Sequence, residues 1–235
     1  MAPIYRLHYA PDNASLIIRL TLEELGVPYA TALIDRAVQG HKAPAYLAVN
    51  PAGLIPALET PDGPIFETGA ILLWLADRHN RLAPAPDSPD RAAFLKWLFF
   101  TSNTLHIALR TRFYPDQYVG ADAAAQAALR RHQADRISNH LTLIEGQAAQ
   151  NPGWLGADQP SVLDFYLACL IRWAKLYPAD HDNSWFDLSR WPHLSDMATR
   201  LENCYSVQAA IHAEGLGPTP FTNPIFATPS EGSAT

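Results

Sequence analysis

Two neighbouring residues, Glu67 and Thr68, carry groups that suit the binding of a small charged molecule. They stand where a short apolar stretch ends and a helical pattern begins. The unpaired N–H groups at a helix start attract a carboxylate, and the hydroxyl of Thr68 adds a further donor. The carboxylate of Glu67 can in turn accept from an ammonium group. The pair is also compatible with a plain helix cap.

Cationic and aromatic groups gather at two further places. His41 and Lys42 share a loop and could hold carboxylates, in a chain whose formal net charge is −6; a solvated loop pair is an equally simple interpretation. Further along, four polar residues spaced 3, 4 and 4 apart would share one side of a helix. Their imidazole, guanidinium and phenol groups would form either a solvent face or a pocket wall for a planar or anionic molecule. The four are Asn103, His106, Arg110 and Tyr114.

Alternating strand and helix patterns before residue 80 are expected to position His41, Lys42, Glu67 and Thr68. Gly26 and the proline two residues later end a helix, and 61–63 forms a hairpin turn. The order βαβ–αββα predicts an α/β region with a mixed four-stranded sheet covered by helices. We expect strands at 4–9, 29–34, 55–60 and 64–67 and helices at 14–25, 44–49 and 68–79.

Only helical patterns follow the proline-rich stretch 82–90. Ser88, with a proline next to it, is typical of a helix N-cap, and Ser161 with Asp164 forms a capping box that opens an apolar helix. The last twenty residues are rich in Pro, Gly, Thr and Ser and are expected to drape over the protein or fray.

Composition excludes several classes of protein. The chain has 235 residues, of which 48% are hydrophobic, so it is not intrinsically disordered. Its acidic balance argues against non-specific nucleic-acid binding, and no apolar run suggests a membrane span or a secretory signal. Two isolated cysteines suit a reducing compartment, so we expect a cytoplasmic protein. The row His132, Arg136 and His140 lacks accompanying carboxylates, so no metal site is expected.

Taken together and in order, several motifs resemble the cytosolic glutathione transferase family, bacterial members above all, over nearly the whole chain. They are Tyr9–Ser15, Asn50–Leu58, Glu67-Thr68 and Ser161–Asp164. The resemblance implies a thioredoxin-like N-terminal domain, an all-α C-terminal helical bundle and a homodimer, with glutathione as co-substrate and no metal. The implied parts are 1–80 (glutathione-binding domain), 81–89 (linker), 90–213 (helical domain with the electrophile pocket) and 214–235 (tail).

The resemblance also assigns a glutathione site. Pro56 matches the family's cis-proline, whose use is to present the backbone N–H and C=O of Ile55 to the cysteinyl part of the peptide. The γ-glutamyl end would lie at Glu67 and Thr68. His41, with Lys42 beside it, would face the glycyl carboxylate.

A glutathione thiol has to be ionised to act, which places it at the start of the helix 14–25, next to a donor. Three candidates follow, in the order Ser15, Asn13 and Tyr9. Ser15 lies one place after Ala14, where some bacterial relatives carry a cysteine. Asp12, Asn13 and Ser15 could instead simply cap the helix.

The expected activity is a glutathione S-transferase acting on a small hydrophobic or anionic electrophile. The polar stripe, which includes His106, would line the electrophile pocket, with Tyr166 and Trp173 as opposite walls. Because Ala14 replaces a cysteine, conjugation is favoured over disulfide exchange through the protein. The alternatives are a non-catalytic glutathione-binding or regulatory protein of the same fold and a glutathione-dependent isomerase or dehalogenase.

Overall fold

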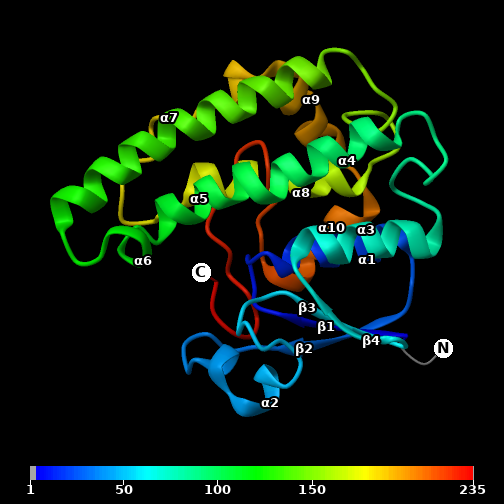
Figure 1. Cartoon of the computed structure of the whole chain (residues 1–235), viewed down its shortest axis with the longest axis horizontal. Coiled ribbons are helices and arrows are strands. Elements are labelled where there is room, and N and C mark those ends of the chain that lie inside the picture. Colours follow the sequence, from blue (N-terminus) through cyan, green and yellow to red (C-terminus); the bar gives the residue numbers. More distant parts are fainter. Residues whose placement is uncertain (1–3, 235) are drawn as a thin grey trace.

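The computed structural model describes residues 4–234 and places a mixed four-stranded sheet beneath a larger group of helices (Figure 1). The strands stand in the order β2-β1-β3-β4. β1 pairs in parallel with β2 and antiparallel with β3, which pairs antiparallel with β4. This arrangement confirms the predicted fold class. The strands are β1 (Tyr5–Tyr9), β2 (Tyr29–Leu33), β3 (Ala57–Thr60) and β4 (Gly63–Phe66).

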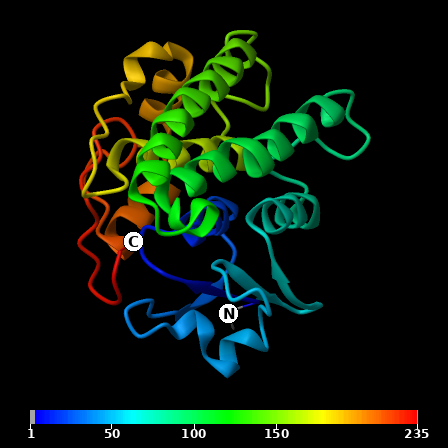
Figure 2. The ribbon, with the colours of Figure 1, turned by 60° about the vertical axis from the view of Figure 1, so that its left-hand side comes forward.

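Two helices, α1 (Ser15–Leu25) and α3 (Thr68–His79), cover the face of the sheet that is turned toward the other helices (Figures 1 and 2). The apolar side chains of α1 are buried, because that helix lies between the sheet and the helical part. Gly26 ends α1 with a φ of 66°, in the left-handed region that glycine adopts without strain. The short η1 (Gly40–Lys42) and α2 (Pro44–Leu47) lie on the other side of the sheet.

The remaining helices form the upper part of the molecule, with the almost fully buried α8 at their centre. The predicted capping box is confirmed, since Ser161 Oγ accepts from the N–H of Asp164 and the Asp164 carboxylate accepts from the N–H of Ser161. These helices are α4 (Arg91–Phe100), the π-helical η2 (Thr101–Leu105), α5 (His106–Phe113), α6 (Asp116–Val119), α7 (Ala123–Ala148), α8 (Val162–Leu176), η3 (Leu188–Arg190), α9 (Pro192–Leu201) and α10 (Tyr205–Glu214).

The predicted N-cap at Ser88 is wrong, because α4 begins three residues later, at Arg91. Residues 88–91 form a turn in which the N–H of Arg91 donates to the carbonyl of Ser88 over 3.0 Å. The Ser88 hydroxyl accepts from the N–H of Asp90 within the same turn. Ser88 therefore belongs to the turn before α4 and does not cap the helix.

One continuous apolar core joins the sheet to the helices. It contains Leu58 and Ile71 from the lower part together with Leu109 and Leu163 from the upper part. After α10 the chain turns back and runs down to the sheet (Figures 1 and 2), and Phe221 is buried on the way. Among residues 4–234, no helix combines the length and the apolar character that a membrane crossing requires.

Candidate functional site

The register of the sheet brings three chain segments to one edge. Ala57 pairs with His8 on one side and with Phe66 on the other. One residue further along both ladders, Pro56 therefore stands between the end of β1 and Glu67, where β4 leads into α3. The N-termini of α1 and α3 follow directly, so two helix starts flank the turn before β3.

The turn before β3 is built to leave Ile55 unpaired. The Ile55–Pro56 peptide bond is cis, as the sequence predicted. Tyr46 and Asn50 donate to the carbonyl of Leu54 over 2.5 and 2.7 Å and fix the turn from below. Within residues 4–234, neither the N–H nor the C=O of Ile55 makes a backbone hydrogen bond. Both groups are thus available to an extended peptide ligand.

The start of α3 offers donors to an anion. Glu67 occupies the N-cap position with a φ of 71°, an uncommon conformation for a residue with a side chain. The first bond of the helix runs from the N–H of Ile71 to the carbonyl of Glu67, so the preceding N–H groups have no partner within the helix. Thr68 is largely buried at this point.

His41 and Lys42 belong to η1 and lie against the loop that leads to Pro56. A Cβ built on Gly53 would come within 3.0 Å of the His41 carbonyl and 3.2 Å of Lys42 Nζ. Burial, then the positive charges of Lys42 and Arg36, lower the pKa of His41. Its buried Nδ1 has no partner among the described residues. The positive charges of Lys42 and Arg36 therefore lie close to His41, beside the turn.

Two of the three candidate thiolate donors already have partners. Ser15 is fully buried, and its hydroxyl donates to the carbonyl of Ala10 over 3.0 Å while accepting from the N–H of the same residue. The Tyr9 hydroxyl donates to the carboxylate of Glu231. Burial, with a further contribution from Glu231, raises the pKa of Tyr9 to about 12.

Asn13 differs from both. Its side chain is half-buried at the start of α1, and its Oδ1 accepts from the N–H of Ala14 over 2.8 Å. In the described part of the chain its side-chain NH₂ group makes no hydrogen bond. Asn13 is thus the candidate of the three whose donor is not already used.

Asp12, which the sequence suggested only as a helix cap, proves to be a buried anion. Its side chain accepts from Arg172 Nε over 2.8 Å, from Trp173 Nε1 over 2.8 Å and from the Tyr177 hydroxyl over 2.8 Å. The available signal was Arg172, a charged residue in the middle of a largely apolar helix. Nothing in the sequence pointed to its partner, which lies 160 residues away.

The polar stripe does not lie on one regular helix, because η2 is π-helical and shifts the rotation of the chain between Asn103 and His106. Asn103 is exposed, with its Oδ1 accepting from Ser102. Tyr114 lies just beyond the end of α5 with a φ of −124°. Arg110 donates to Oε1 of Gln117 over 3.0 Å.

His106 lies where the sheet and helical parts meet. Its Nδ1 lies 2.8 Å from the Tyr166 hydroxyl, and its ring centroid lies 6.0 Å from that of Trp173. The hydroxyl of Tyr166 also interacts with Thr68, at the start of α3. Burial, then the charge of Arg110, lower the pKa of His106 to about 4, so the imidazole is neutral near pH 7.

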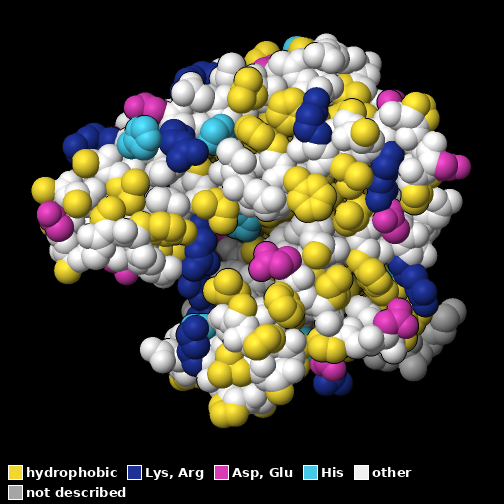
Figure 3. Space-filling model, viewed as in Figure 1, with side chains coloured by type: hydrophobic (Ala, Val, Ile, Leu, Met, Phe, Trp, Pro, Cys, Tyr) yellow, Lys and Arg dark blue, Asp and Glu magenta, His cyan; other side chains and the backbone are white. Residues whose placement is uncertain are grey.

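A hollow separates the helical part from the lobe that carries α2, and Lys and Arg side chains border it (Figure 3). Arg36 reaches across from the loop after β2 and donates to the Tyr114 hydroxyl over 3.2 Å. The ring of Tyr114 lies 5.9 Å from the guanidinium of Arg110. Arg36, Arg110 and Tyr114 therefore combine positive charge with an aromatic ring where the loop after β2 meets the end of α5.

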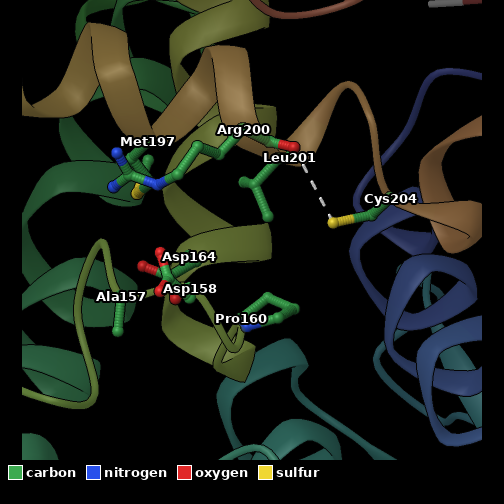
Figure 4. A pocket seen from close by; sticks show the side chains of 8 residues that line it. All are labelled: Ala157, Asp158, Pro160, Asp164, Met197, Arg200, Leu201 and Cys204. Atoms are coloured by element: carbon green, nitrogen blue, oxygen red, sulfur yellow. Dashed lines mark hydrogen bonds between the residues drawn. The ribbon is translucent and has the colours of Figure 1, made fainter.

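A separate cavity of about 30 Å³ lies beside the capping box (Figure 4). It is lined in part by Cys204, whose Sγ contacts the Arg200 carbonyl at 3.8 Å. None of the residues discussed above as ligand-binding lines it. Over residues 4–234, no cluster of His, Cys, Asp or Glu could hold a metal ion.

Comparison with protein families identifies two matching segments. Residues 14–78 match the model of the glutathione S-transferase N-terminal domain, and residues 123–196 match that of its C-terminal domain. The first segment contains the turn before β3 and the start of α3. The second contains all of α7 and α8.

Individual proteins agree with the family models. Glutathione S-transferase GST-4.5 of Xanthomonas campestris pv. campestris is 29% identical over 214 residues, which are 90% of this chain and 99% of that protein. A sphingomonad glutathione S-transferase, solved in complex with glutathione, is 32% identical with a TM-score of 0.70 and covers 90% of this chain and 100% of its own. The disulfide-bond oxidoreductase YfcG of Escherichia coli is 28% identical over 90% of this chain and 96% of that protein.

Proposed function

Because the chain belongs to the glutathione S-transferase family, we propose that it activates the thiol of glutathione for attack on a small electrophile. The observation that carries this proposal is the edge of the sheet where the unpaired backbone of Ile55 stands between the starts of α1 and α3. An extended tripeptide with a carboxylate at each end has matching partners there. Those partners are Ile55 and Pro56 for the cysteinyl unit, Glu67 and Thr68 for the γ-glutamyl unit, and His41 and Lys42 for the glycyl carboxylate.

Asn13 is the proposed donor to the glutathione sulfur. A thiol with a pKa near 8.5 is only a few per cent ionised at pH 7. Lowering that pKa by about two units takes about 2.7 kcal/mol of preferential thiolate stabilisation. The free side-chain NH₂ of Asn13, together with the unpaired N–H groups at the start of α1, supplies stabilisation of that order. Ser15 and Tyr9 then shape the loop from inside through their existing bonds.

The electrophile would bind on the side of the site formed by η2, α5 and α8. The buried ring of Trp173 backs His106, while Arg110 and Tyr114 offer charge and a phenol ring. These groups favour a planar electrophile, or one carrying a negative charge. The neutral imidazole of His106 can donate a hydrogen bond without competing for the acidic proton of the thiol.

We further propose that the division into 1–80, 81–89, 90–213 and 214–235 describes its functional parts, and that the protein is a cytoplasmic homodimer. Exposed Phe66 on β4 and Phe99 on α4 offer apolar surface to a second copy. Both cysteines are free thiols, as a reducing compartment maintains them. Light scattering after gel filtration measures the mass, for which we expect twice 25.9 kDa.

The proposal is tested by titrating glutathione into the protein calorimetrically and then assaying conjugation with an activated aryl halide. We expect saturable binding, and a turnover that exceeds the uncatalysed reaction and is lost on heating. Lack of glutathione binding would refute the proposal. Tight binding without turnover of any electrophile would instead favour a ligand-holding or regulatory protein. Accumulation of a mixed disulfide at Cys204, the partly exposed cysteine, would favour disulfide exchange through the protein.

A further inference from the structure

The loop between β1 and α1, residues 10–14, is held from behind by a buried group of charges. Asp12 adopts a φ of 50° with its side chain fully inside the protein. Its N–H donates to Glu214 Oε2 over 2.8 Å, and Glu214 Oε1 accepts from Arg19 Nε over 2.7 Å. With Arg172 these groups form two carboxylates and two guanidiniums, all buried, whose formal charges balance.

Arg172 uses every donor it has. An arginine side chain offers five N–H groups. Nε and one N–H of Nη2 bind the two oxygens of Asp12 over 2.8 and 2.9 Å. The other three reach backbone carbonyls of the C-terminal segment: Nη1 binds Leu216 and Pro220 over 3.3 and 3.2 Å, and Nη2 binds Ile225 over 2.9 Å. One side chain thus fixes the loop and the C-terminal segment against each other.

The C-terminal segment, residues 215–232, also contacts the loop directly. Glu231 accepts from the Tyr9 hydroxyl, one residue before the loop. Gly232 has a φ of 70°, and a Cβ built there would lie 2.7 Å from Leu33 Cδ1 and 3.3 Å from Pro11 Cδ. The segment is therefore seated on the loop and on the end of β2, as its course in Figures 1 and 2 shows.

We propose that Arg172 and the C-terminal segment position the 10–14 loop, so that Asn13 is aimed at the glutathione sulfur only while the segment is seated. Arg172 is a positioning residue in this account, since it touches neither glutathione nor the electrophile. The inference rests on the proposed function for its chemical consequence. The mechanical part, that the segment orders the loop, stands independently of it.

Two shortened chains test the proposal. A chain that stops after Thr222 keeps Phe221 and Thr222, whose N–H groups are bound by Glu202, but loses the carbonyl of Ile225 and the contacts of Glu231. A chain that stops after Gly232 keeps every contact described above and is the matched control. Both are compared with the full chain by amide hydrogen exchange, by the pKa of the bound thiol and by steady-state kinetics.

For the stop after Thr222 we expect exchange of the loop amides to quicken at least about tenfold, as a locally opened segment requires. The bound thiol pKa should rise by about one unit toward its free value, and kcat at neutral pH should fall. The KM for glutathione should rise only about threefold, the amount by which that pKa change weakens thiolate binding near about pH 7, because the remaining binding groups lie outside the loop. The control should match the full chain throughout.

Unchanged loop exchange would overturn the proposal. So would faster exchange with an unshifted thiol pKa, since the segment would then only add stability. If the chain that stops after Thr222 does not fold, a stop after Ala227 decides. It keeps the carbonyl of Ile225 and removes the contacts of Glu231 and Gly232 together with the hydrogen bond from the N–H of Thr228 to the carbonyl of Gly215, and exchange equal to that of the full chain refutes the proposal. Absence of glutathione binding in the full chain would refute the proposed function and leave the exchange comparison valid.

Discussion

Single side chains at the 10–14 loop show why candidate residues cannot be ranked by type alone. Ser15 has a hydroxyl in a favourable place, yet both of its hydrogen-bonding roles are filled by Ala10. Asn13 keeps a free donor because its oxygen, not its nitrogen, binds the following N–H. The sequence proposed a group of three residues. It could not separate them, because which donor remains free depends on the hydrogen bonds that form within the folded loop.

Tyr166 gives a test at the same scale. Replacing it with phenylalanine removes the partner of His106 Nδ1, over 2.8 Å, and leaves the ring in place. The imidazole then loses its fixed tautomer, so we expect kcat to fall by about three- to tenfold, with about 1 kcal/mol lost in stability. Nitrogen NMR of His106 reports the tautomer, steady-state kinetics report kcat, and urea unfolding reports the loss of stability.

Tyr118→Phe is the control for that substitution, since Tyr118 is exposed on α6. Equal kinetics for Tyr166→Phe and the wild type, with an unaltered His106 spectrum, would show that the hydroxyl does not orient the imidazole.

Among elements, the starts of α3 and α8 were predicted closely, whereas the start of α4 and the irregular helix were not. The pattern predicted 68–79 for α3, and the structure has Thr68–His79. The Ser161 capping box was equally clear because its two residues signal locally. The π-helical turn at Thr101–Leu105 carried no comparable signal, and it separates residues that a regular helix would align.

The start of α3 yields a prediction at this scale. Thr68→Val removes the hydroxyl but keeps the size of the side chain. One donor to the γ-glutamyl carboxylate is lost, so we expect the KM for glutathione to rise about tenfold, with kcat changed less than about twofold. Thr68→Ser retains the donor and should restore the wild-type KM. A kcat that falls while KM stays constant would place Thr68 in the chemical step instead.

For the whole molecule, the shared core and the Asp12–Arg172 pair predict that the sheet and the helices unfold together. The core contains residues of both parts, and the ion pair is fully buried. Breaking a buried pair of this kind costs about 3–5 kcal/mol. Sequence patterns predicted the two kinds of architecture, but not this link, because Asp12 and Arg172 meet only once the molecule is assembled.

The pH dependence of the free energy of unfolding reports on side chains buried between the sheet and the helices and within the helical part. The pKa of His106 is about 4 in the folded protein, below its ordinary value of 6.5. Between these values the unfolded chain binds a proton that the folded chain does not, so this residue makes the free energy of unfolding fall as the pH falls. Asp164 acts in the opposite sense, since burial raises its pKa to about 6 and its contribution is lost as the pH rises.

His106→Gln isolates the first effect. The free energy of unfolding is measured with urea at about pH 7 and about pH 5. Between these pH values it should fall less, or rise more, in His106→Gln than in the wild type. His132→Gln, at an exposed position of α7, is the control. An identical change between the two pH values in wild type and His106→Gln would contradict an imidazole that stays neutral at about pH 5 in the folded protein.

The pKa of the bound glutathione thiol tests the central claim most directly. It is measured from thiolate absorbance near 240 nm against pH, in the wild type and in Asn13→Ala and Ser15→Ala. We predict a value about two units below the free thiol in the wild type, a return toward the free value in Asn13→Ala and a retained shift in Ser15→Ala. An unshifted thiol in the wild type, or a shift that survives in Asn13→Ala and disappears in Ser15→Ala, would contradict the account.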